Sequence, residues 1–270
     1  MQANRGDRMG RRGGAGTSGG IDFQTRLGAW IATAILAERS APPLWDWPSS
    51  STLEALEVET GEKVDDLRVT NSSGSSAYLQ AKLTLSLSPS NTSDFASVIF
   101  AFVRQYLGED EGTPFGDYDR LVLVVGAGSS SLIRSDLRRV LDRSRGLLED
   151  RTLDSIAGSK KERKVTDAFF DHARSAWHDA TGSDPSESEL QAFTSKVWVS
   201  VFDLSDGGTD ARFAQSQLRS SVLADPTQEA QAWGILISLV AGLSAVQGGA
   251  DRPRLQELLA DKGVGILAAP

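Results

Sequence analysis

Apolar residues in the first half of the chain change from helical to alternating spacing and back again, and this order limits the folds available. Residues 21–37 repeat their apolar positions at helical spacing, whereas residues 53–58, 67–70 and 77–85 alternate as half-buried strands do. A serine-rich turn at 71–76 separates the last two strands. The pattern predicts a helix followed by three strands, with the last two joined as a hairpin.

The alternation of helix and strand continues beyond the hairpin. Residues 95–106 place their apolar side chains on one helical face behind the capping residues 92–94, and residues 121–125 (LVLVV) form an apolar run of strand length. A basic helix around Leu137 and Leu141 follows. We therefore expect an α/β fold with the core order α-β-β-β-α-β-α.

Three regions of the chain differ in composition. Residues 1–20 are rich in glycine and arginine and lack the apolar side chains that offset the entropy of ordering, which predicts a flexible tail. Residues 21–150 form the predicted core, and residues 151–270 predict a mostly helical accessory or assembly domain with one strand at 197–202. The most apolar stretch, 233–241, is too short to cross a bilayer, so no membrane contact is expected.

The chain has 270 residues, no cysteine and a formal charge of −8. The lack of cysteine excludes a disulfide framework, a thiolate metal site and a catalytic thiol, and it fits a cytoplasmic protein. The negative charge argues against a protein that coats nucleic acid broadly, because such proteins carry a basic surface that displaces counterions. Any contact with nucleic acid is therefore expected to be local.

The basic helix offers one local contact for a phosphate backbone. Its interleaved acids, such as Asp136 and Asp142, equally favour ordinary ion pairs at the surface. The candidate nucleic-acid residues are Arg134, Arg138, Arg139 and Arg143.

Three polar side chains lie on one face of the predicted hairpin. Asp66 stands at the entry of the first arm, while Gln80 and Lys82 lie two residues apart on the second arm and project from the same face. A carboxylate, an amide oxygen and an ammonium group suit metal-assisted phosphodiester hydrolysis, because Mg²⁺ takes oxygen ligands and a lysine orients water or neutralises charge. A solvated polar face is the alternative, but the regular apolar alternation on the opposite face favours a rigid site.

The segments around these residues resemble the PD-(D/E)xK restriction-endonuclease-like nucleases, in the variant that has glutamine before x-Lys. The matching segments are 64–69 (VDDLRV), 79–82 (LQAK), 93–95 (SDF) and 20–24 (GIDFQ). The chain is similar to Mrr-type restriction enzymes. It is more similar to the double-stranded DNA endonuclease domains of bacterial antiphage proteins, both the CBASS effectors and the NACHT or other STAND ATPases.

The resemblance implies a restriction-endonuclease-like core that cleaves double-stranded DNA in antiphage defence, with little sequence preference and with Mg²⁺ or Mn²⁺. Asp66 would be the main metal ligand, and Gln80 and Ala81 would complete the metal site. Lys82 would stabilise the transition state or position water, and Asp22 would be an accessory carboxylate. The implied partners are duplex DNA and either further copies of the chain or a sensor or ATPase domain or subunit that activates it.

Several of these groups have a structural alternative. Asp22 follows a glycine pair at a helix start, so capping or a dipole role explains it equally well. Asp65 points to the other face of a regular strand, and Glu57 and Glu59 either add a ligand or form a solvated edge. The two histidines, at 172 and 178, do not face one another on a helix and are expected at the surface.

Two other functions fit parts of the sequence. The nuclease-like fold could serve as an inactive scaffold whose helical module drives oligomerisation, since the net charge is acidic and Gln80 is neutral. The segment 126–129 (GAGS) resembles the loop of sirtuin-like NAD-consuming domains, because glycines between a strand and a helix can hold a pyrophosphate. A plain strand-to-helix turn is the simpler explanation of this segment.

Overall fold

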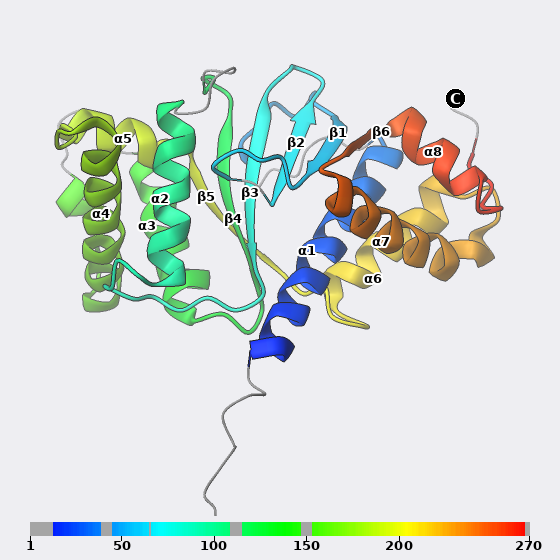
Figure 1. Cartoon of the computed structure of the whole chain (residues 1–270), viewed down its shortest axis with the longest axis horizontal. Helices are drawn as coiled ribbons and strands as arrows, with labels where there is room; N and C mark the ends of the chain where they lie inside the picture. The colour runs from blue at the N-terminus through cyan, green and yellow to red at the C-terminus, as the bar shows by residue number, and fades with distance from the viewer. Residues whose placement is uncertain (1–12, 39–44, 65, 109–114, 147–152, 268–270) are drawn as a thin grey trace, which may run out of the picture.

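A six-stranded mixed sheet lies between two layers of helices (Figure 1). The computed structural model describes residues 13–38, 45–64, 66–108, 115–146 and 153–267, and the side chains of these residues except 13–18 and 153–154. The strands are β1 (Leu53–Val58), β2 (Leu67–Asn71), β3 (Ser76–Lys82), β4 (Arg120–Gly126), β5 (Val197–Phe202) and β6 (Gly249–Asp251).

The helices cover both faces of this sheet. The α-helices are α1 (Gly13–Leu36), α2 (Asp94–Leu107), α3 (Arg138–Arg145), α4 (Lys160–Thr181), α5 (Glu187–Lys196), α6 (Thr209–Gln217), α7 (Glu229–Val246) and α8 (Arg252–Ala260). Short segments of other helical pitch are η2 (Leu132–Leu137), η3 (Leu153–Ile156), η4 (Leu218–Val222) and η5 (Pro226–Gln228). The mixed α/β architecture and the expected order of the first elements are confirmed.

The strands lie in the order β5-β4-β3-β2-β1-β6. β1, β2 and β3 pair antiparallel, whereas β3, β4 and β5 pair parallel, and β6 runs antiparallel to β1. A parallel pair needs a crossover, and α2 supplies it between β3 and β4. β4 is buried along its whole length, as expected of a continuous apolar run in a covered parallel strand.

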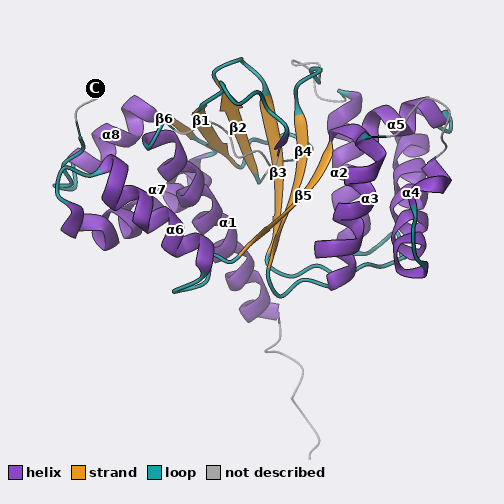
Figure 2. Ribbon diagram, turned by 180° about the vertical axis from the view of Figure 1, so that it is seen from behind, coloured by secondary structure: helices purple, strands orange, loops and turns teal. Residues whose placement is uncertain are grey.

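Each face of the sheet packs against its own helical layer, as Figure 2 shows from behind. α1, α6, α7 and α8 cover one face, and α2, α3, α4 and α5 cover the other. Leu79 and Ala81 of β3 belong to the core on the α1 side, while Tyr78 belongs to the core on the α2 side. Because side chains alternate along a strand, Gln80 and Lys82 lie on the α2 side with Tyr78.

Two boundaries differ from those expected. Helix α1 begins at Gly13, not at residue 21, because extending an existing helix needs no new nucleus. The rest of the expected tail, residues 1–12, lies outside the described residues. β3 ends at Lys82 instead of continuing to residue 85.

The chain on both sides of residue 150 contributes to the same sheet. The expected domain boundary itself falls in 147–152, outside the described residues, and the later region supplies β5 and β6. Helix α7 packs closely on α1, where a side chain at Gly28 would collide with Val240.

The helix over Pro226–Val246 is long and apolar enough to cross a membrane by length and composition alone, with 22% of its apolar window buried. The stretch expected to be too short is thus part of a longer helix, because α7 continues in small and apolar residues.

A close approach of two chain segments determines where β3 ends. A Cβ at Gly126, the last residue of β4, would lie 2.4 Å from the carbonyl oxygen of Leu83. A side chain there would push the segment after Lys82 away from the sheet. The equivalent atom at Gly128 would meet only the Cγ2 of Thr84 at 3.6 Å, an ordinary contact.

We predict that Gly126→Ala lowers the free energy of unfolding by about 1–3 kcal/mol, the usual cost of overpacking. Gly128→Ala is the matched control and should change the free energy of unfolding by less than about 0.5 kcal/mol. Urea denaturation followed by tryptophan fluorescence measures both. Equal stability of the two variants would contradict the close approach.

Candidate functional site

The side chain of Asp66 joins the start of β2 to the end of β3. Its Oδ2 accepts a hydrogen bond from Gln80 Nε2 at 2.5 Å and another from the backbone N–H of Ala81 at 2.7 Å. Gln80 is only 7% exposed, whereas Asp66 and Lys82 are half-buried. The structure therefore brings together Asp66, Gln80 and Ala81, as the sequence predicts.

The backbone of Asp66 is held from two further elements. Its carbonyl oxygen accepts hydrogen bonds from Gln24 Nε2 of α1 at 3.2 Å and from the backbone N–H of Glu59 at 3.2 Å. Gln24 Nε2 also donates to Glu59 Oε1 at 2.8 Å, and the Ser244 hydroxyl of α7 lies 3.4 Å from the same oxygen. We call Gln24, Glu59, Asp66, Gln80, Ala81 and Lys82 the hairpin site.

Glu59 adopts a backbone conformation that glutamate rarely takes. Its φ is +50°, in the left-handed region, where a non-glycine residue costs of order 1–3 kcal/mol and persists only if its surroundings hold it. The hydrogen bonds to Gln24 and to Asp66 hold it here. The sequence offered Glu59 only as an optional ligand and Gln24 only as part of the GIDFQ segment; the structure gives both a defined place.

Lys82 completes the site on the α2 side of the sheet. It is the last residue of β3 and lies opposite Val125 in the parallel register with β4. Among the described residues, no acidic group forms an ion pair with its ammonium group. A half-buried lysine without such a partner can place its charge on an incoming anion.

The oxygens of the hairpin site suit a hard divalent cation. The Asp66 carboxylate is present, and a half-turn of the Gln80 amide exchanges its nitrogen and oxygen without changing its shape. The N–H and C=O of one residue point the same way in an extended strand, so the Ala81 carbonyl lies on the side of Asp66. Within the described residues, no three histidines or carboxylates cluster to form a metal site. A cation here would thus depend on these three oxygens and on water, as Mg²⁺ often does.

The other predicted carboxylates lie elsewhere. Asp22 is 58% exposed and pairs with Arg26, which in turn binds Asp206, so nothing connects it to Asp66. Glu57 pairs with Arg68 through both of its oxygens. Asp65 lies outside the described residues. The structure therefore gives Gln24, not Asp22, as the side chain that α1 contributes to the hairpin site.

The arginines of the basic helix are engaged in ion pairs. Arg139 and Arg143 both bind the buried carboxylate of Glu162 on α4, and Arg139 also binds Asp136. Arg138 lies 4.0 Å from Asp142, and Arg134 donates from Nε to the carbonyl oxygen of Ser129. Of the two explanations that the sequence left open, the structure favours ion pairing.

Glu162 is held in its charged form by these neighbours. Hydrogen bonds from Arg143, and then from Arg139 and the backbone N–H of Gly158, lower its pKa from the ordinary 4.5 to about 2. The pair of arginines thereby fixes the first turn of α4 against α3. Their charge is balanced locally and contributes little to a track for phosphate groups.

One of the two histidines is buried, which corrects the expectation that both lie at the surface. His172 is 1% exposed, and its ring nitrogens lie 3.0 Å from Asn91 Oδ1 and 2.8 Å from the carbonyl oxygen of Ser88. The sequence could not show this, because the partners lie more than 80 residues away. His172 attaches the segment after β3 to α4. His178 is exposed, as expected, and faces Asp184.

The glycine turn after β4 is packed against the segment that follows β3. The Ser129 hydroxyl is buried and accepts a hydrogen bond from the backbone N–H of Leu85. The N–H groups of Ser129 and Ser130 donate to the carbonyl oxygens of Gly126 and Leu85. These donors are engaged within the protein, which favours a structural turn over a pyrophosphate site.

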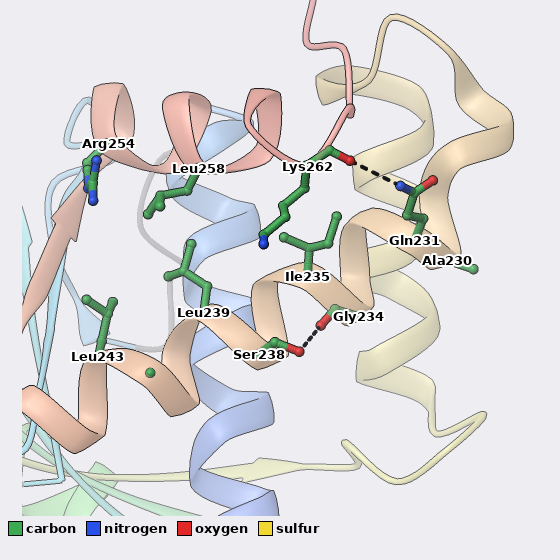
Figure 3. A pocket seen from close by; sticks show the side chains of 11 residues that line it. Ala230, Gln231, Gly234, Ile235, Ser238, Leu239, Leu243, Arg254, Leu258 and Lys262 are labelled. Atoms are coloured by element: carbon green, nitrogen blue, oxygen red, sulfur yellow. Dashed lines mark hydrogen bonds between the residues drawn. The ribbon is translucent and has the colours of Figure 1, made fainter.

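A groove of about 640 Å³ lies between α7 and α8 (Figure 3). Along α7 its floor carries a row of small residues at four-residue spacing: Ala230, Gly234, Ser238 and Gly242. Leucine and isoleucine side chains line the rest, and the side chain of Lys262 extends over the groove from the end of α8. None of the hairpin-site residues lines it.

Comparisons with known proteins assign no family to the chain. No family model and no curated protein matches the sequence. Similar solved structures include the Cap4 SAVED/CARF-domain containing receptor of Acinetobacter baumannii, at 16% identity and a TM-score of 0.49, which covers 90% of this chain and 46% of that one. The same receptor with the cyclic trinucleotide 3'3'3'-cAAA gives 14% identity and a TM-score of 0.47 over 90% and 44%.

The corresponding Moraxella osloensis receptor shows 15% identity and a TM-score of 0.48, covering 90% of this chain and 47% of that one. The present chain thus spans less than half the length of these structures. Similarity at this level assigns neither a ligand nor an activity.

We predict that Glu162→Gln lowers the melting temperature at pH 7, because the variant leaves Arg139 and Arg143 without their carboxylate. A carboxylate whose pKa is lower in the folded state stabilises the fold above its unfolded pKa and loses that effect as the pH falls towards its folded pKa. In the parent chain this loss should run from about pH 4.5 down to about pH 2. Thermal melts across this range should therefore show a shallower acid dependence for the variant.

Glu54→Gln is the matched control, because Glu54 is an exposed carboxylate on β1. It should follow the parent chain at every pH. A variant at 162 that also follows the parent chain would show that Glu162 does not hold α4 against α3.

Proposed function

We propose that this chain is a metal-dependent endonuclease that cleaves double-stranded DNA with low sequence specificity in antiphage defence. The observation that carries the proposal is the Asp66 carboxylate, held by Gln80 and Ala81 at the end of β3, the strand that ends in Lys82, whose ammonium group has no ion pair among the described residues. The proposal includes the finer fold, a restriction-endonuclease-like core formed by α1 to α3 and β1 to β4. The sequence resemblance supports it, and so does the order of elements in the structure.

Each residue of the hairpin site has a distinct task in this chemistry. Oxygens of Asp66, Gln80 and Ala81 would hold a Mg²⁺ or Mn²⁺ ion, which would supply Lewis-acid chemistry and an activated water. Lys82 neutralises the charge that grows on the phosphate oxygens as water attacks phosphorus and the sugar oxygen leaves. Gln24 and Glu59 position Asp66 through its backbone.

Gln80 distinguishes this site from one with two acidic ligands. A neutral amide lowers metal affinity relative to a carboxylate, so we infer that the phosphate of the bound DNA contributes to holding the cation. Cleavage would then depend strongly on DNA binding. This dependence fits a nuclease that is inactive as a single subunit. It would become active when several copies, or a sensor or ATPase partner, bring more than one cleavage site onto the same DNA duplex.

We predict that Asp66→Asn abolishes both metal binding and cleavage, whereas Lys82→Ala slows cleavage but leaves metal binding unchanged. Mn²⁺ that binds the folded chain but not the unfolded chain raises the melting temperature. This rise therefore measures metal binding independently of cleavage. Plasmid nicking in Mg²⁺, measured over a range of protein concentrations, should fall by about 10²–10³-fold in Lys82→Ala, the usual loss when one group that stabilises transition-state charge is removed. The parent rate should rise more steeply than linearly with concentration.

Asp94→Asn is the matched control, because Asp94 lies in the first turn of α2 outside the hairpin site. It should bind Mn²⁺ and cleave like the parent chain. If the parent chain shows neither a Mn²⁺-dependent rise nor cleavage at any concentration, the inactive scaffold is the correct function. If Asp66→Asn cleaves normally, the hairpin site is wrongly assigned.

A further inference from the structure

Four cationic side chains gather on the first turns of α4 and are left unpaired. They are Lys160, Lys161, Arg163 and Lys164, all of them exposed. In the part of the chain that the structure describes, none of their charged groups forms an ion pair or hydrogen bond. We call these four residues the α4 cation cluster. It contrasts with the neighbouring α3 arginines, which are bound to acids.

The position of the cluster costs the isolated protein stability. The start of a helix carries a partial positive charge, so cations there are unfavourable, as are like charges placed three or four residues apart. The nearby acid Glu162 gives no relief, because its carboxylate faces Arg139 and Arg143. Asp167 and Asp171 line the same pocket as these cations and offset part of their charge, but within the described residues neither acid forms an ion pair with them. An anionic partner would relieve this repulsion.

One wall of the pocket beside the α4 cation cluster belongs to the chain segment that follows the hairpin site. Lys160, Arg163 and Lys164 line a pocket of about 360 Å³ together with Leu87 and Pro89, which belong to the segment that follows β3, and with Asp167, Ala168 and Asp171 of α4. Leu87 is five residues from Lys82, so even a fully extended chain places them at most about 18 Å apart. Figure 1 shows this segment crossing from the end of β3 to the helices of the α2 layer.

The relative position of the two sites is fixed by hydrogen bonds. His172 of α4 contacts Ser88 and Asn91 in the crossing segment, and Ser129 and Ser130 hold Leu85. The pocket wall at Leu87 therefore has anchors on both sides. A ligand that contacts Lys82 and the α4 cation cluster together must therefore be extended and anionic.

We propose that the α4 cation cluster binds the phosphate backbone of the duplex that the hairpin site cleaves. Duplex DNA carries one negative charge per about 1.7 Å of its axis, so its backbone can meet cations at both places at once. The acidic chain as a whole repels DNA. The cluster confines the attraction to the side of the molecule where β3 ends in Lys82. The identification of the ligand as duplex DNA rests on the proposed function. The position of the binding surface rests on the cations of the α4 cation cluster.

The test compares duplex binding by the parent chain with that of the triple variant Lys160→Gln, Arg163→Gln and Lys164→Gln. Fluorescence anisotropy of a labelled 20-bp duplex in EDTA measures binding without cleavage. We expect the triple variant to bind at least 10-fold more weakly at 0.1 M salt. The slope of log affinity against log salt should shrink by about 2–3, since each phosphate contact contributes about 0.9.

The control removes the same number of charges from the opposite helical layer, by Arg212→Gln, Arg219→Gln and Lys262→Gln. It should keep the parent affinity and salt slope, and circular dichroism should show native helix content in both triple variants. Unchanged affinity and slope in the α4 variant would overturn the inference. So would binding of the parent chain to phosphatidylserine vesicles but not to the duplex.

The two proposals fail separately. If the parent chain binds DNA through α4 but never cleaves it in Mg²⁺, the surface is correct and the endonuclease is not. If the α4 variant binds and cleaves DNA like the parent chain while Asp66→Asn does not cleave, the endonuclease is correct and the surface is not.

Discussion

The contact between Asp66 and the end of β3 determines the geometry of the candidate site. One carboxylate oxygen accepts bonds from Gln80 and Ala81, and hydrogen bonds to a charged group contribute about 1.5–3 kcal/mol each. The same residue is held through its carbonyl by Gln24 and Glu59, so four segments meet at one amino acid. Such support gives the carboxylate little freedom to move, which a site for a weakly held cation requires.

Charge is distributed unevenly over the two faces of this acidic chain. On the α2 side, buried Glu162 neutralises the α3 arginines and thereby secures α4, while the exposed cations of α4 keep their charge. The segment after β3, held by His172 and Ser129, connects these cations to Lys82. Local structure thus explains how a chain with a net charge of −8 can keep a cluster of cations on its surface.

Much of the fold was predictable because it rests on local periodicity. Alternation and apolar runs located β1, β2, β4 and β5. The end of β3 was not predictable, because it depends on the approach of Gly126 to Leu83, and these residues are more than 40 positions apart. The burial of His172 was missed for the same reason, since its partners come from the segment after β3.

The sequence by itself determined the α/β class, the order of the first elements, and the common face of Gln80 and Lys82, because strand geometry follows from spacing alone. Only the tertiary structure decided which side chain of α1 reaches Asp66. Asp22 and Gln24 are two residues apart on one helix and therefore point in different directions, and packing of α1 on the sheet turns Gln24 inward while Asp22 binds Arg26. The same packing decided that the α3 arginines are bound to acids and that the α4 cations have no acidic partner within the described part of the chain.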